Sequence, residues 1–124
     1  MPELTQDVIT RACIVCALWS TTDDAGNPLD DTYGPDDLAP ECTAAFAQHC
    51  ADFVTTHVAD CQEWQERFGL EQLGHALWLT AQRHGAGFWD RGAGELGDRL
   101  TEAAHTSGFA GADLYVGDDG WLYL

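Results

Sequence analysis

The amino-acid sequence predicts an α+β protein: two or three N-terminal helices, followed by a small antiparallel sheet of hairpins with one further helix. Three observations support this fold class. Apolar residues recur at helical spacing up to residue 68, short aromatic runs follow residue 69, and two apolar runs near the C-terminus flank a Gly-Asp-Asp-Gly turn. The chain has 124 residues, 45% of them hydrophobic, which suits one packed core. We therefore expect a single domain over residues 1–124.

Two helical stretches are expected in the first half of the chain. The first runs from Thr5 to Ser20, with Thr5 as its N-cap and Asp7 in the first turn, where the helix dipole favours negative charge. The second runs from Leu38 to Phe68 and is long for one helix, so we expect a break between His57 and Trp64. Its apolar residues recur at a mean spacing of about 3.7, as on one helix face: Cys42, Phe46, Cys50, Phe53, His57, Cys61, Trp64 and Phe68.

An acidic loop is expected between these stretches, over residues 21–40. It contains Gly26, Pro28, Gly34 and Pro35, which are typical of turns and exclude a continuous helix. Six aspartates lie in this segment and Glu41 follows it directly. The loop is therefore the most acidic part of the sequence.

Beyond Gly69 the apolar runs become shorter and more aromatic. Residues 76–80 and 87–89 are predicted to pair as a β-hairpin, while a helix from Glu71 to Gln82 is the competing interpretation. Residues 95–106 are predicted to form a helix with Leu96 and Leu100 on its apolar side. Residues 113–116 and 121–124 flank the Gly-Asp-Asp-Gly turn, so we expect a second hairpin there.

The charge balance excludes several classes of function. The chain has 21 acidic residues against five arginines and no lysine, a formal net charge of −16. Nucleic acids and anionic membranes are bound by clusters of Lys and Arg, so we expect neither as a direct ligand. The longest apolar run, residues 12–19, is shorter than the roughly 20 residues that cross a bilayer, and no basic segment precedes it. Five cysteines, an odd number in a chain without an export signal, are typical of a reducing cytoplasm.

The cysteines and histidines form few catalytic or metal-binding patterns. Cys13 and Cys16 have the spacing of a metal half-site, but they lie inside an apolar helix and no second Cys-x-x-Cys pair is present. The other cysteines lie on the apolar stripe of residues 38–68, where a free thiol packs as a small hydrophobe. We therefore expect no enzyme, and assign no catalytic residue, metal ligand or cofactor. The alternative is a small metal-binding or hydrolytic protein that uses cysteines, His84 and Asp90.

The acidic charge itself indicates a function. A net charge of −16 matches roughly 27 Å of duplex DNA, at about one charge per 1.7 Å of axis, and a domain of this length is about 35 Å across. Such a protein is steered toward basic surfaces. We expect an acidic protein-binding inhibitor, a DNA mimic that blocks a basic nucleic-acid-binding protein; the alternative is that the charge serves only to keep the protein soluble. The residues expected to contact this partner are Asp23, Asp24, Asp30, Asp31, Asp36, Asp37, Glu41, Asp118 and Asp119.

Four separated motifs are HALWLT (residues 75–80), HGAGFWDR (84–91), GDRLT (97–101) and DLYVGDDG (113–120). In these motifs, and more loosely in residues 36–41, the chain resembles a family of small acidic proteins of bacteriophages, prophages and other mobile elements. The resemblance implies a setting, the cytoplasm of a bacterial host, and no catalytic residues. In that setting the protein is similar in kind to anti-CRISPR and anti-restriction proteins that bind a host nuclease complex. A further alternative is a homo-oligomeric accessory phage protein, for example a homodimer that pairs through its C-terminal strand.

Overall fold

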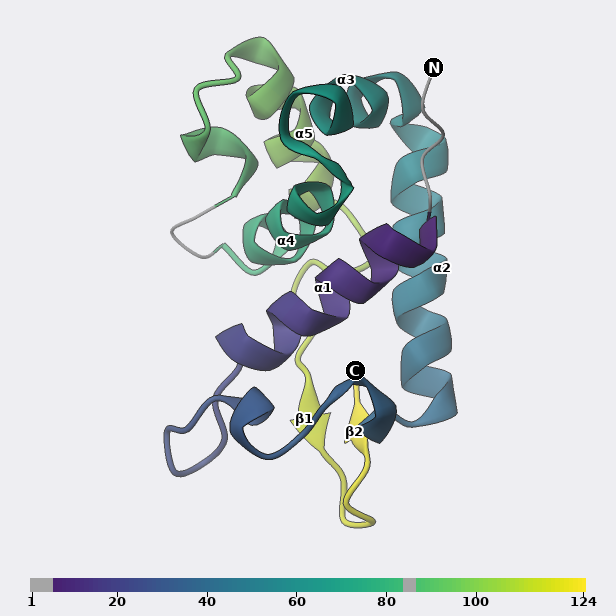
Figure 1. Ribbon diagram of the computed structural model, residues 1–124, viewed down its shortest axis with the longest axis vertical. Coiled ribbons are helices and arrows are strands. Elements are labelled where there is room, and N and C mark those ends of the chain that lie inside the picture. Colours follow the sequence, from purple (N-terminus) through teal and green to yellow (C-terminus); the bar gives the residue numbers. More distant parts are fainter. Residues whose placement is uncertain (1–5, 84–86) are drawn as a thin grey trace.

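The computed structural model describes residues 6–83 and 87–124. In this part of the chain the protein is mostly helical, with one two-stranded antiparallel sheet (Figure 1). The helices are α1 (Gln6–Ser20), α2 (Pro40–Thr56), α3 (Val58–Phe68), α4 (Leu70–Ala81) and α5 (Glu95–His105). The strands are β1 (Tyr115–Val116) and β2 (Leu122–Tyr123), and the short 3-10 helices are η1 (Leu29–Asp31), η2 (Pro35–Asp37) and η3 (Phe88–Asp90). The α+β class is thus confirmed in its broad form only, because helices dominate.

Helix α1 lies in the middle of the molecule, where it crosses α2 and packs along α4 (Figure 1). Its apolar side chains are buried on several sides and include Ile9, Cys13 and Leu18. Gly74 of α4 lets the two helices approach closely, because a Cβ atom at this position would lie 2.5 Å from the backbone oxygen of Ile9. The predicted first helix is confirmed over residues 6–20, while its expected N-cap, Thr5, lies outside the described residues.

The predicted apolar stripe of residues 38–68 is confirmed, as two helices. The expected break falls at His57, whose backbone (φ −124°, ψ 38°) ends α2 and begins α3. Gly69, with φ +95°, then turns the chain from α3 into α4, in a left-handed conformation that glycine adopts without strain. The cysteine and aromatic members of the stripe in α2 and α3 lie in the core: Cys42, Phe46, Cys50, Phe53, Cys61 and Trp64.

The predicted hairpin of residues 76–80 and 87–89 is wrong. Residues 76–80 belong to α4, as in the competing interpretation, and Phe88–Asp90 form η3. The physical reason is burial: α4 packs against α1, α3 and α5, so every residue from 76 to 81 is buried. An apolar run that is buried on all sides has no helical periodicity to distinguish it from a strand. Four α-helices, rather than the expected two or three, therefore precede residue 82 within the described residues.

The predicted C-terminal elements are confirmed. Helix α5 spans Glu95–His105, and β1 and β2 pair antiparallel. The hairpin is joined to the end of the acidic loop, because Ala39 N–H donates a hydrogen bond to Leu122 O (2.9 Å). The loop and the hairpin therefore lie at the same end of the molecule (Figure 1). No helix in the described ranges is long and apolar enough to span a membrane.

Candidate functional site

The first half of the acidic loop, residues 21–29, folds back on itself. Asp23 N–H donates to Asn27 O (2.8 Å), and Leu29 N–H donates to Thr21 O (2.9 Å). The Asp23 carboxylate closes the turn, since its Oδ1 accepts hydrogen bonds from Ala25 N–H (2.9 Å) and Asn27 N–H (3.0 Å). The Leu29 side chain is buried. This half of the loop is therefore held by a turn at its tip and an apolar anchor at its base.

The second half of the loop, residues 30–41, is anchored to the hairpin. In η2 the Asp37 carboxylate accepts a hydrogen bond from Gly34 N–H (2.8 Å), and Leu38 is buried and bridged to Leu122 of β2. Two of the predicted residues, Asp23 and Asp37, thus also hold the local backbone in place. The other acidic side chains of this segment are exposed to solvent: Asp24, Asp30, Asp31, Asp36 and Glu41.

The turn of the hairpin adds two exposed carboxylates, Asp118 and Asp119. The Asp119 carboxylate accepts hydrogen bonds from the Tyr123 hydroxyl (2.5 Å) and from Trp121 N–H (3.0 Å). The bond from Tyr123 is the largest cause that lowers the pKa of Asp119, and the same bond raises the pKa of Tyr123 to about 12. Gly117 leaves room for the tyrosine, because a Cβ atom at this position would lie 2.5 Å from its ring. The turn is therefore fixed by side chains as well as by backbone pairing.

The Tyr123 hydroxyl is expected to ionise later than an ordinary tyrosine. Its bond to Asp119 favours the protonated phenol, so its pKa lies at about 12, against a usual value of about 10. While Asp119 is ionised, the stability from this bond is present in full below pH about 10 and is lost as the pH rises through about 12. An ultraviolet titration should resolve one late tyrosine, and Asp119→Asn should move its pKa back toward the usual value. A late tyrosine that persists in the variant would contradict this assignment.

These segments form one acidic end of the molecule, defined as residues 21–41 and 113–124 (Figure 1). All nine predicted partner-binding residues lie in it; eight are exposed and Asp37 is half-buried. Together with Asp113 they make ten acidic side chains, and the acidic end contains no Arg, Lys or His. The fold therefore brings the acidic segments of the loop and of the hairpin to one end of the molecule. Neither segment contains a basic residue that could neutralise their charge.

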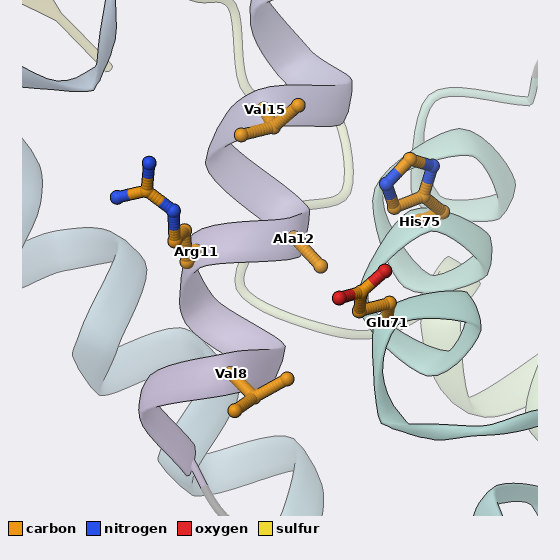
Figure 2. Close-up of a pocket in the computed structure, with 6 residues that line it drawn as sticks. All are labelled: Val8, Arg11, Ala12, Val15, Glu71 and His75. Carbon is orange, nitrogen blue, oxygen red and sulfur yellow. The ribbon is translucent and has the colours of Figure 1, made fainter.

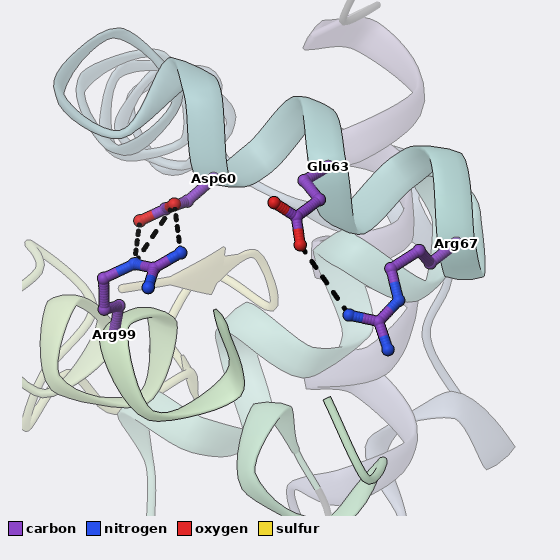
Figure 3. A network of polar contacts seen from close by, with 4 residues as sticks. All are labelled: Asp60, Glu63, Arg67 and Arg99. Atoms are coloured by element: carbon purple, nitrogen blue, oxygen red, sulfur yellow. Dashed lines mark hydrogen bonds and ion pairs between the residues drawn. The ribbon is translucent and has the colours of Figure 1, made fainter. Parts of the chain in front are cut away.

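The five arginines all lie outside the acidic end. Two of them neutralise carboxylates among the helices (Figure 3). Arg99 donates from Nε and Nη2 to the Asp60 carboxylate (3.1 and 3.0 Å), which raises the pKa of Arg99. Arg67 lies 3.7 Å from the Glu63 carboxylate, one helical turn away. The negative potential is therefore concentrated at the acidic end.

A groove of about 440 Å³ lies between the acidic loop and β1. Next to its carboxylates it presents the side chains of Tyr115 and Val116, which are 54% and 38% exposed. Sequence reasoning missed this groove, because the two segments that form it are far apart in the chain. It is lined by Thr22, Asp23, Asp24, Ala25, Leu29, Leu114, Tyr115 and Val116.

A smaller groove of about 270 Å³ lies between α1 and α4 (Figure 2). It is flanked by the apolar side chains of Val8 and Val15, two helical turns apart on α1, with Arg11 and Glu71 as its charged neighbours. Burial is the largest cause that lowers the pKa of His75, so this ring is neutral near pH 7. The groove is thus mostly apolar and differs in character from the acidic end.

The metal-binding or hydrolytic alternative gains no support from this geometry. All five cysteines are free and buried, as predicted, and burial raises the pKa of Cys16 and of Cys61 to about 12, so both thiols stay protonated. Within residues 6–83 and 87–124, no group of three His, Cys, Asp or Glu side chains is placed to hold a metal ion. The Asp90 carboxylate caps η3 by accepting a hydrogen bond from Gly87 N–H (3.1 Å). His84 lies outside the described residues.

Comparisons with protein-family models, with curated proteins and with solved structures find no significant match to the chain. The resemblance to acidic phage proteins therefore stays a prediction, and the acidic end is the feature of the molecule that indicates a function.

Proposed function

We propose that the protein is an acidic protein-binding inhibitor whose acidic end occupies the basic, nucleic-acid-binding surface of another protein. The observation that carries the proposal is that the two segments of the acidic end, which lie at the same end of the molecule, contain ten acidic residues without any Arg, Lys or His. A nucleic-acid channel is the complementary surface, because its Lys and Arg residues are arranged to neutralise rows of phosphates. The protein acts in this mechanism as a DNA mimic.

Preorganisation of the loop supports this mechanism. The carboxylates of Asp23, Asp37 and Asp119 accept backbone N–H groups, and Leu29 and Leu38 are buried beneath the loop. The exposed carboxylates between these anchors therefore lie on a backbone that is already ordered. Binding then costs less conformational entropy than it would for a disordered acidic tail.

Exposed aromatic rings supply the apolar part of such an interface. Tyr115 and Trp121 of the hairpin are 54% and 46% exposed. Tyrosine and tryptophan are common anchors of protein interfaces, and their faces also attract arginine guanidinium groups. The proposed partner is accordingly a basic nucleic-acid-binding protein of a bacterial host, of the CRISPR effector or restriction nuclease class, bound in the host cytoplasm.

Capture from a bacterial lysate tests the proposal. Tagged protein should retain a nucleic-acid-binding protein at low salt, and should release it at ~0.5 M salt, where surface charges are screened within a few Å. Added duplex DNA should also release it, because both ligands compete for one surface. Mass spectrometry identifies the captured protein. Retention of a partner that neither salt nor DNA displaces would contradict the mimic mechanism, as would the capture of no specific protein.

A further inference from the structure

We infer that the groove beside β1 binds an extended, basic segment of the partner, which adds to the sheet as a third strand. The inference deepens the proposed function and rests on it, because it states how the acidic end recognises a basic protein. It is carried by the free edge of β1, by the shape of the groove and by the charge of its walls.

The outer edge of β1 presents main-chain groups with no partner in the described part of the chain. Gly117 N–H donates to Trp121 O (2.8 Å), and Val116 pairs in register with Leu122. Hydrogen-bonded and non-hydrogen-bonded pairs alternate along an antiparallel ladder, so the N–H and C=O groups of Val116 point away from β2. The direction of these groups alternates along a strand, so an added strand that continues past Tyr115 would next meet the main-chain groups of Leu114. The edge therefore offers donors and acceptors at the spacing that an added strand requires.

The groove lies along this free edge. Its lining comes from residues 22–25 and 114–116 together with Leu29, and none of it comes from β2. Leu29 and Leu114 are buried and give the groove an apolar base. The groove thus has the edge of a strand on one side, a loop on the other and apolar side chains at its base, as expected of a site for an extended peptide.

Charge decides which peptide fits. Asp23 and Asp24 lie on the wall opposite β1. Only Oδ1 of Asp23 is used by the loop backbone, which leaves Oδ2 to accept from a cation. Side chains of an added strand alternate between the two faces of the sheet, so Arg or Lys at every second position would stand on the face away from the apolar base, where these long side chains can bend toward the Asp23 and Asp24 carboxylates; the exposed ring of Tyr115 offers a face to a guanidinium. A second copy of this chain fits poorly, because it would bring another acidic end into the same slot.

Binding of a defined peptide to the full chain tests the inference. The probe is a capped peptide of about eight residues that alternates Arg and Thr, long enough for one strand. We expect it to bind at low salt and to slow amide hydrogen exchange at Val116. The same peptide, N-methylated at every second residue along one edge, keeps its charge but loses the main-chain donors of that edge, so its affinity should fall at least tenfold.

Two variants of Val116 test the same main-chain hydrogen bonds from the side of the protein. Val116→Pro removes the outer N–H and leaves the Gly117–Trp121 hydrogen bond intact, so the peptide should bind at least tenfold more weakly. Val116→Thr keeps the N–H and should bind the peptide as the wild type does. The methylated peptide keeps the test decisive even if the proline variant folds poorly.

The outcomes separate this inference from the proposed function. Unchanged affinity of both the methylated peptide and Val116→Pro would overturn strand addition, while salt-sensitive capture of a basic partner would leave the proposed function standing. Failure of the unmodified peptide to bind at low salt would also overturn strand addition. A stable dimer in light scattering that Val116→Pro dissociates would assign the edge to a second copy instead, and would overturn the inference.

Discussion

Charge reversal of Asp24, Asp30, Asp31 and Asp36 to lysine is expected to abolish capture of the basic partner. All four carboxylates are exposed, so the fold should tolerate the change, and the net charge moves from −16 to −8. Each reversal removes an attraction of up to about 1 kcal/mol at a surface contact and replaces it by repulsion. Four of them should weaken binding at least 100-fold, or about 2.7 kcal/mol. Isothermal titration at low salt with the captured protein measures this.

The choice of positions separates charge from folding. The carboxylates of Asp23 and Asp37 are left in place because they hold the loop backbone. A matched control variant reverses four exposed carboxylates outside the acidic end, and it reaches the same net charge: Glu66, Glu71, Glu95 and Glu102. The control should lose only a few-fold in affinity, through weaker long-range steering. Equal losses in the two variants would show that total charge, rather than the acidic end, governs binding.

Local sequence patterns are sufficient to predict the elements that bury a single face or contain a specific turn. The break at His57 and the stripe on either side of it follow from helical periodicity, and the C-terminal hairpin follows from its Gly-Asp-Asp-Gly turn. The local pattern favours a strand over residues 76–80 of α4, because residues 76–81 are all buried and no polar face marks the helical period. Only the packing of α1, α3 and α5 around this helix distinguishes it from a strand.

The candidate site can be predicted in part from the sequence, for a similar reason. Acidic residues without cationic neighbours are visible in the sequence, and the nine predicted residues do lie at one end of the molecule. The folded loop determines which of these carboxylates accept hydrogen bonds from backbone N–H groups. Asp23 and Asp37 do so, and each closes a turn. The groove beside β1 joins residues 22–29 to residues 114–116, a long-range contact that no local pattern encodes.

The replacement Gly74→Ala is expected to destabilise the protein strongly. The added Cβ atom would lie 2.5 Å from Ile9 O, 2.8 Å from the Ala12 Cβ atom and 3.0 Å from Cys13 N, all on α1. A helix backbone cannot yield locally, so α1 and α4 must separate, and overpacking of this kind costs about 1–3 kcal/mol. Alanine's better helix propensity offsets part of that cost. We expect a net loss of about 2 kcal/mol, or about 8 °C in Tm, in thermal and urea unfolding.

The same chemical change at Gly34 provides the control. Nothing lies within 4 Å of a Cβ atom there, and its backbone (φ −122°, ψ −179°) is accessible to any residue. Gly34→Ala should therefore be neutral or slightly stabilising, because it restricts only the unfolded chain. The loop carboxylates are carried on the chain that leaves α1, so the α1–α4 contact also determines where they lie. A Tm that rises in Gly74→Ala would mean that the two helices do not meet at this glycine.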